Sequence, residues 1–208
     1  MKHARTLGLV ALAITALTAF AGVSSASAAQ FKANGSPVML FGQDDHQDTF
    51  TIDGEPISCL AQFENSSLAM PTNTLTVSAV YSKCGNAFFG WNINMGNCVF
   101  EFLQPNAELR GNLAIRCSGA AKMTMKTSIF GGECEVSIGE TGNTNLPSIG
   151  YSNNNGRISM SIGVSEITAN KLKDNPICLL NGTGETKSLS YYGPLVLEGT
   201  SGIGISVG

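Results

Sequence analysis

The chain has few of the residues that most often carry catalysis or bind metals. It holds two histidines, one tryptophan and 13% charged residues in 208 positions. Beyond the N-terminal leader, His46 is the only histidine. Zinc sites draw on histidine and on closely spaced cysteines, and no CxxC pair occurs. We therefore expect no metal site and no cofactor.

No motif for nucleophilic or phosphate chemistry is complete. Serine hydrolases place the nucleophile in a Gly-x-Ser-x-Gly turn, whereas residues 150–152 read Gly-Tyr-Ser and continue with asparagine at 153 and 154. The segment around Lys187 resembles a phosphate loop but lacks the glycine before the lysine. Glu101, Glu133 and Glu135 are candidates for the paired carboxylates of a glycosidase, but nothing in the sequence brings two of them together. The sequence predicts a protein that is not an enzyme.

The first 28 residues predict an export signal. A basic start with Lys2 and Arg5 precedes an almost wholly apolar run over 7–23, and small residues follow at the spacing that signal peptidase recognises. We expect cleavage between Ala28 and Ala29. An uncleaved membrane anchor is the alternative, because the apolar run is nearly long enough to span a bilayer.

Cleavage leaves one secreted, extracellular, β-rich domain over residues 29–208, with no membrane span. Loss of Lys2 and Arg5 lowers the basic count from 12 to 10 against 15 acidic residues, so the net charge becomes −5. A negative protein disfavours nucleic acid and anionic membranes as partners.

All six cysteines follow the leader, and an even number in an exported protein predicts three disulfides. They are Cys59, Cys84, Cys98, Cys117, Cys134 and Cys178. Six cysteines allow 15 connectivities. Pairing of neighbours in sequence is the favoured arrangement, namely 59 with 84, 98 with 117 and 134 with 178. The middle pair has the best support, because pairing Phe100 with Ile115 places the two cysteines opposite each other.

Alternating apolar residues separated by turn dipeptides predict β-hairpins. The turns are Asp-Gly at 53–54, Gly-Asn at 96–97, Gly-Gly at 131–132 and Asn-Gly at 155–156. Apolar residues share a face in 57–63 and again in 75–81. Because a one-residue slip would turn each apolar set to the wrong face, these patterns also predict the register.

Three of these turns predict particular partners. The turn at 96–97 places Trp91 opposite Phe102 in the core. The turn at 131–132 places Ile129 opposite Cys134, with Lys126 opposite Ser137 on a solvated face. The turn at 155–156 places Ile149 opposite Ile162.

The remaining segments complete an all-β prediction. Residues 38–41 are typical of an edge strand, and 166–175 fit either a short helix or a loop. Strands are expected over 189–197 and 203–207, with Pro194 at an edge or bulge. In the first of these, either Tyr191 or Tyr192 must point outward. The predicted architecture is a disulfide-linked antiparallel β-sandwich or flattened barrel, built mainly of hairpins.

An acidic cluster at 44–48 is the densest polar segment. Asp44, Asp45 and Asp48 surround His46 there. The cluster lacks the alternate ligand spacing, the glycine and the distal glutamate of a calcium loop. A solvated loop is the favoured interpretation, and whether the three aspartates bind a cation stays open.

The layout resembles small secreted actinobacterial proteins of unknown function with six cysteines. The segments that carry the resemblance are the start Ala-Gln-Phe-Lys-Ala, then Ile-Ser-Cys-Leu-Ala-Gln-Phe at 57–63, the strand at 75–84 and Met-Gly-Asn-Cys-Val-Phe-Glu-Phe at 95–102. The resemblance implies secretion and disulfides, and it supplies no catalytic residue.

These observations predict a secreted, non-enzymatic structural or binding protein of the bacterial cell exterior. The alternative is an extracellular carbohydrate-binding or carbohydrate-active protein. A cell-surface glycan or protein is the expected kind of partner. A glycan-binding module would expose Tyr191 or Tyr192, whereas an enzyme would converge two carboxylates in a cleft.

Overall fold

A computed structural model describes residues 29–35, 38–43, 47–68, 71–103, 105–129, 132–139, 149–173 and 183–208. The predicted signal peptide and Ala28 lie outside these residues. The described chain is all-β, as predicted. Its strands are β1 (Phe31–Ala33), β2 (Val38–Gln43), β3 (Asp48–Ile52), β4 (Glu55–Leu68), β5 (Thr74–Gly85), β6 (Gly90–Asn94), β7 (Cys98–Leu103), β8 (Arg110–Cys117), β9 (Met123–Ile129), β10 (Gly132–Ile138), β11 (Ile149–Asn154), β12 (Arg157–Lys173), β13 (Gly184–Gly199) and β14 (Ile205–Val207), with a 3₁₀ turn η2 (Thr200–Gly202) before the last.

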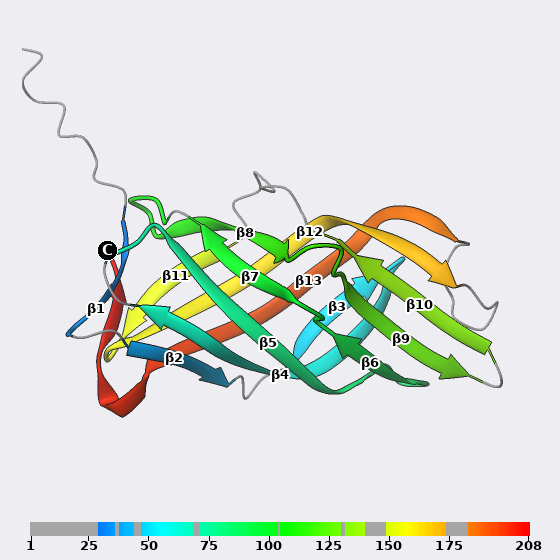
Figure 1. Ribbon diagram of the computed structural model, residues 1–208, viewed down its shortest axis with the longest axis horizontal. Helices are drawn as coiled ribbons and strands as arrows, with labels where there is room; N and C mark the ends of the chain where they lie inside the picture. The colour runs from blue at the N-terminus through cyan, green and yellow to red at the C-terminus, as the bar shows by residue number, and fades with distance from the viewer. Residues whose placement is uncertain are drawn as a thin grey trace, which may run out of the picture.

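Four long strands, β4, β5, β12 and β13, hold the main sheet together. Each pairs with different short strands at its two ends. For example, β5 pairs with β7 through 74–77 and with β6 through 84–85. Similarly, β12 pairs with β11 through 157–162 and with β10 through 170–173. In Figure 1, β12 and β13 run on one diagonal and cross behind β5 and β7, which run on the other.

The strand pairings close into two rings that share the four long strands. One ring runs β5-β7-β8-β11-β12-β13-β2-β4, and the other runs β5-β6-β9-β10-β12-β13-β3-β4. The fold is therefore a flattened barrel, one of the two predicted architectures. Ring closure leaves few unpaired strand edges, and unpaired edges are what promotes association between sheets.

The barrel interior is packed with aromatic and aliphatic side chains. Phe50 lies 5.2 Å from Tyr81 and 4.8 Å from Tyr191, between ring centroids, and Phe100 stacks on Tyr191 at 5.6 Å. Each such pair stabilises by roughly 0.5–1.5 kcal/mol beyond its burial. An apolar void of about 10 Å³ lies beside these rings. As bounded by the described residues, this void is too small to hold an organic ligand.

Two predicted hairpins form at their predicted turns, and the partners predicted across the turn at 155–156 are confirmed. Phe50 pairs with Ile57 across the turn at 53–54, and Ile149 pairs with Ile162 across the turn at 155–156. In both turns the two central residues have positive φ: 51° and 93° in the first, 50° and 79° in the second. Asn-Gly and Asp-Gly favour this geometry, which matches the twist of the flanking strands. Local turn chemistry therefore determines these two registers.

The prediction of a hairpin across 96–97 is wrong, because the strands on its two sides, β6 and β7, do not pair with each other. Residues 95–98 do form a tight turn, in which the Cys98 amide donates to the Met95 carbonyl at 3.0 Å. However, β7 pairs with β5 on one edge and with β8 on the other, so no edge is left for β6. Strand β6 pairs instead with β5 and β9. Trp91 therefore lies opposite Cys84, not opposite Phe102, and it is only partly buried.

The hairpin predicted at 131–132 exists with a register shifted by two residues. Ile129 pairs with Gly132, and Cys134 pairs with Thr127. A shift of two preserves the face of every side chain, because strand side chains alternate. Lys126 consequently lies opposite Glu135, not Ser137, and the two form an ion pair at 3.0 Å.

Two further predictions need correction. Strand β2 is not an edge strand, because it pairs with both β4 and β13. Residues 166–173 are neither helix nor loop, since β12 continues to Lys173 and pairs there with β10 and β13. This long-range pairing overrides the weak local pattern. Residues 174 and 175 lie outside the described chain.

Two of the three predicted disulfides are present as predicted. Cys59 is bonded to Cys84, and Cys98 to Cys117, which is its direct partner in the sheet. Cys134 is also disulfide-bonded. Cys178, its predicted partner, lies outside the described residues. The two observed bonds each join neighbouring strands, β4 to β5 and β7 to β8.

The two termini of the described chain lie side by side at one end of the barrel. Strand β1 pairs with β14, and Gln30 exchanges two backbone hydrogen bonds with Gly208 (Figure 1). The side chain of Asn153 donates to the Val207 carbonyl at 2.7 Å and accepts from its amide at 2.8 Å. Phe31 is fully buried and packs edge-on against Tyr151. This small sheet covers one end of the core.

Candidate binding groove

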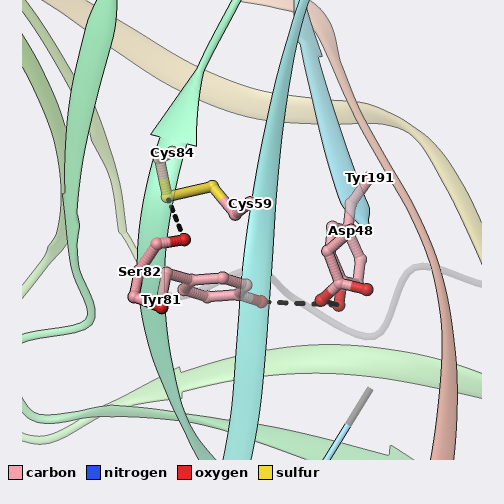
Figure 2. Close-up of a disulfide and its surroundings, with 6 residues drawn as sticks. All are labelled: Asp48, Cys59, Tyr81, Ser82, Cys84 and Tyr191. Carbon is pink, nitrogen blue, oxygen red and sulfur yellow. Dashed lines mark hydrogen bonds between the residues drawn. A yellow bond between two sulfur atoms is a disulfide. The ribbon is translucent and has the colours of Figure 1, made fainter. Parts of the chain in front are cut away.

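Only part of the acidic cluster at 44–48 lies in the described chain, and Asp48 does not behave as predicted. It is fully buried at the start of β3, where its Oδ2 accepts a hydrogen bond from the Tyr191 hydroxyl at 2.6 Å. The Tyr81 hydroxyl donates to the Tyr191 hydroxyl at 3.4 Å, as Figure 2 shows beside the Cys59–Cys84 bond. A solvated loop is therefore the wrong interpretation for Asp48. Asp44, Asp45 and His46 lie outside the described residues.

Burial raises the pKa of the hydroxyls of Tyr81 and Tyr191 well above the usual value, and the nearby carboxyl of Asp48 raises both further. Burial also raises the pKa of Tyr151, whose ring lies in the interior against Gly111. The folded protein therefore keeps these three phenol protons at a pH where the unfolded chain loses them. Tyr81, Tyr191 and Asp48 form a hydrogen-bonded network in the interior of the barrel.

Tyr192 points the other way from Tyr191, as the alternation in a strand requires. Tyr191 is 1% exposed and Tyr192 is 66% exposed. The Tyr192 ring lies over Gly163 of the neighbouring strand: a Cβ added to that glycine would meet three of its atoms at 3.1–3.3 Å. Because Gly163 has no side chain, the Tyr192 ring can lie against the sheet, and much of the ring remains exposed to solvent.

Tyr192 forms one side of an outer groove of about 460 Å³. The floor consists of small residues brought together by strand register. Gly150 of β11 pairs with Ser161 of β12, and Gly163 lies two residues further along. A Cβ added to Gly150 would meet nothing within 4 Å, so the floor is open there. The absence of side chains at Gly150 and Gly163, with only the small side chain of Ser161 beside them, makes the surface concave.

The opposite side of the groove is the segment 108–110, held in one conformation by Asn106. The Asn106 side-chain oxygen accepts from the amides of Glu108, at 2.9 Å, and Arg110, at 2.8 Å. Leu109 has a positive φ of 55°, and its carbonyl accepts from the Tyr151 amide at 2.7 Å. Glu108 and Arg110 are exposed. The groove therefore offers an anion, a cation and a hydroxyl around an aromatic ring.

A second surface concavity, of about 410 Å³, lies at the β3–β4 and β5–β6 side of the barrel. Its lining residues are Gln47, Pro56, Ser58, Lys83, Gly85, Asn86 and Ala87. None of them is aromatic, so this concavity lacks a flat apolar surface for a ligand to rest on. We regard the groove beside Tyr192 as the better candidate.

The candidate carboxylates of a glycosidase lie elsewhere. Glu101 pairs with Arg116 at 2.7 Å, Glu135 with Lys126, and Glu133 with Lys173. None of the three glutamates lines either concavity. Within the part of the chain that the structure describes, no group of three or more His, Cys, Asp or Glu residues is placed to hold a metal ion. The same part contains no helix long and apolar enough to cross a membrane.

Sequence reasoning identified Tyr192 as one of two alternatives and missed the rest of the groove. The register predicted from the turn at 155–156 already places Gly150 opposite Ser161. These two residues of the groove floor could therefore have been predicted from the sequence. The pairing of β12 with β13 is not local, and it alone brings Tyr192 over Gly163.

The fold and the groove define a disulfide-linked all-β protein with an outer polar groove. No protein family, no curated protein and no solved structure matches the chain. The resemblance to secreted actinobacterial proteins stays a prediction.

Proposed function

We propose that this chain is a secreted, non-enzymatic binding protein of the bacterial cell exterior, and that the groove beside Tyr192 is its binding site. The exposed Tyr192 ring carries the proposal, because it stands at the side of a groove whose lining also includes the polar side chains of Glu108, Arg110 and Ser161. The signal-like leader, the disulfides and the lack of a catalytic motif support export and a non-enzymatic role.

A carbohydrate is the ligand class that fits this groove. A sugar ring has a flat face of C–H groups, which pack on the electron-rich face of an aromatic ring. Its rim of hydroxyls can donate to Glu108 and accept from Arg110, while Ser161 can do either. A purely apolar ligand would leave these three polar groups without partners, which costs binding energy.

A carbohydrate-active enzyme is the second candidate, and it has less support. Glycoside hydrolysis normally uses two carboxyl groups roughly 5–10 Å apart. The groove contains one carboxylate, Glu108, among the residues that the structure describes. Turnover of a bound oligosaccharide would favour this candidate over a binding role.

The test is titration of the isotope-labelled protein with soluble oligosaccharides of three kinds: neutral, acidic and N-acetylated. We expect amide shifts at Gly150, Ser161 and Gly163 for at least one kind. Tyr192→Ala should weaken that binding about tenfold or more, a loss of about 1.4 kcal/mol. Tyr192→Phe, which keeps the ring, should bind nearly as well as the wild type.

Phe88→Ala is the matched control, because Phe88 is 74% exposed and is not among the groove residues. It should leave affinity unchanged. If no oligosaccharide shifts the groove amides, or if Phe88→Ala weakens binding as much as Tyr192→Ala does, the proposed site is wrong.

A further inference from the structure

A buried lysine and a buried aspartate meet at one end of the barrel, outside the groove. Lys171 of β12 and Asp53 of the β3–β4 turn each have 6% of their side chain exposed, and Lys171 Nζ lies 3.0 Å from Asp53 Oδ2. The two residues are 118 positions apart in sequence. Burying a charged pair is costly, because desolvation offsets much of the attraction between the charges.

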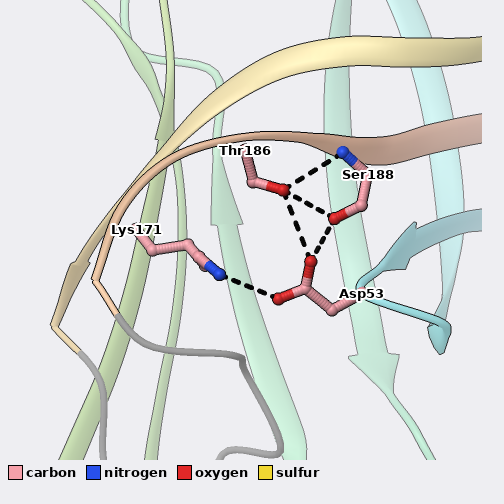
Figure 3. Close-up of polar contacts among 4 residues, drawn as sticks. All are labelled: Asp53, Lys171, Thr186 and Ser188. Atoms are coloured by element: carbon pink, nitrogen blue, oxygen red, sulfur yellow. Dashed lines mark hydrogen bonds and ion pairs between the residues drawn. The ribbon is translucent and has the colours of Figure 1, made fainter.

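The two oxygens of the Asp53 carboxyl have different surroundings, as Figure 3 shows. Oδ2 faces the Lys171 ammonium, whereas the hydroxyls of Thr186, at 3.4 Å, and Ser188 both donate to Oδ1. The Ser188 amide donates to Thr186 Oγ1 at 3.1 Å, which orients that hydroxyl. The Lys171 amine, which is the possible nucleophile, thus lies at Oδ2. The two hydroxyl donors lie at Oδ1.

We propose that Lys171 and Asp53 condense to an intramolecular amide that links β12 to the β3–β4 turn. Proton transfer within the ion pair gives a neutral amine and a carboxylic acid. Nζ then attacks Cγ, and negative charge develops on Oδ1, where the hydroxyls of Ser188 and Thr186 stabilise it as an oxyanion hole does. The Cγ–Oδ2 bond breaks, and Oδ2 leaves as water with the two protons that Nζ gives up.

The step is balanced without any oxidant, reductant or further reactant, because an ammonium and a carboxylate contain the atoms of one amide and one water. Positioning supplies much of the catalysis: the reacting groups are held at contact distance by two strands and a tight turn. The product replaces two buried charges by a neutral amide whose oxygen keeps its hydroxyl donors. Ser188 is exposed, so the water has a route out.

The test is the intact mass of the full secreted protein after reduction and alkylation of its cysteines. We expect the wild type to be lighter than its sequence by one water molecule. In its tryptic map, the peptide containing Lys171 should be joined to the peptide containing Asp53. Lys171→Arg keeps the positive charge but cannot form this amide, and it should have the full mass. Ser188→Ala should form the amide more slowly.

A wild-type protein of full mass, with separate Lys171 and Asp53 peptides, would overturn the proposal and leave a plain ion pair. Loss of water that persists in Lys171→Arg would overturn it as well, because it would place the dehydration at the Asp53-Gly54 backbone. The wild-type peptide map decides the question even if a variant does not fold.

Discussion

Removal of the Tyr191 hydroxyl tests the buried network directly. Tyr191→Phe keeps the ring that packs on Phe50 and Phe100. It deletes the hydroxyl that donates to Asp48 and that accepts the weaker hydrogen bond from Tyr81. Asp48 is fully buried, so water cannot replace the lost donor at 2.6 Å. A hydrogen bond to a charged group is worth about 1.5–3 kcal/mol, and we expect the free energy of unfolding to fall by about that amount.

Two other Tyr→Phe variants serve as controls, and both should cost less. Tyr81→Phe should cost less than about 1 kcal/mol, because its hydroxyl donates at 3.4 Å, beyond the usual range for O–H···O bonds. Tyr192→Phe should change stability by less than about 0.5 kcal/mol, because its side chain is exposed. Urea unfolding with the disulfides intact measures all three. Equal stabilities for Tyr191→Phe and Tyr192→Phe would refute the role given to the Asp48 hydrogen bond.

Three further results are expected. Replacing Cys98 and Cys117 by alanine should lower stability by about 3 kcal/mol in urea unfolding, since a loop of 19 residues is released. Gly193→Ala should lower the free energy of unfolding by more than about 2 kcal/mol, because its Cβ would lie 2.0 Å from Asp48 Oδ1. Gly150→Ala, whose Cβ would meet nothing within 4 Å, should change it by less than about 0.5 kcal/mol in the same assay. Stability should fall as pH rises above about 10, by up to roughly 1.4 kcal/mol per pH unit for each of the three buried tyrosines, because the unfolded chain loses phenol protons that the folded chain keeps. Phenolate absorbance from these tyrosines should therefore appear together with unfolding, and its appearance in the folded protein would contradict their burial.

The sequence by itself determined the local parts of this protein. Alternating apolar residues define strands, and the dipeptides at 53–54 and 155–156 define hairpin registers through the positive φ of their central residues. The opposition of Phe100 and Ile115 places Cys98 against Cys117, and the disulfide follows. At 131–132 the glycine pair did not determine the register, and the observed register differs from the predicted one by two residues. Each side chain therefore stays on its predicted face but has a different partner.

Only the tertiary structure decided which strands lie beside strands distant in sequence, because loop closure over long separations leaves no local signal. Strands β5 and β8 pair with the two edges of β7, so β6 cannot pair there. Trp91 of β6 therefore lies opposite Cys84 of β5. The tertiary structure buried Asp48 against Gly193 and Tyr191. It also set the register between the consecutive strands β12 and β13, which placed Tyr192 over Gly163 at the side of the groove.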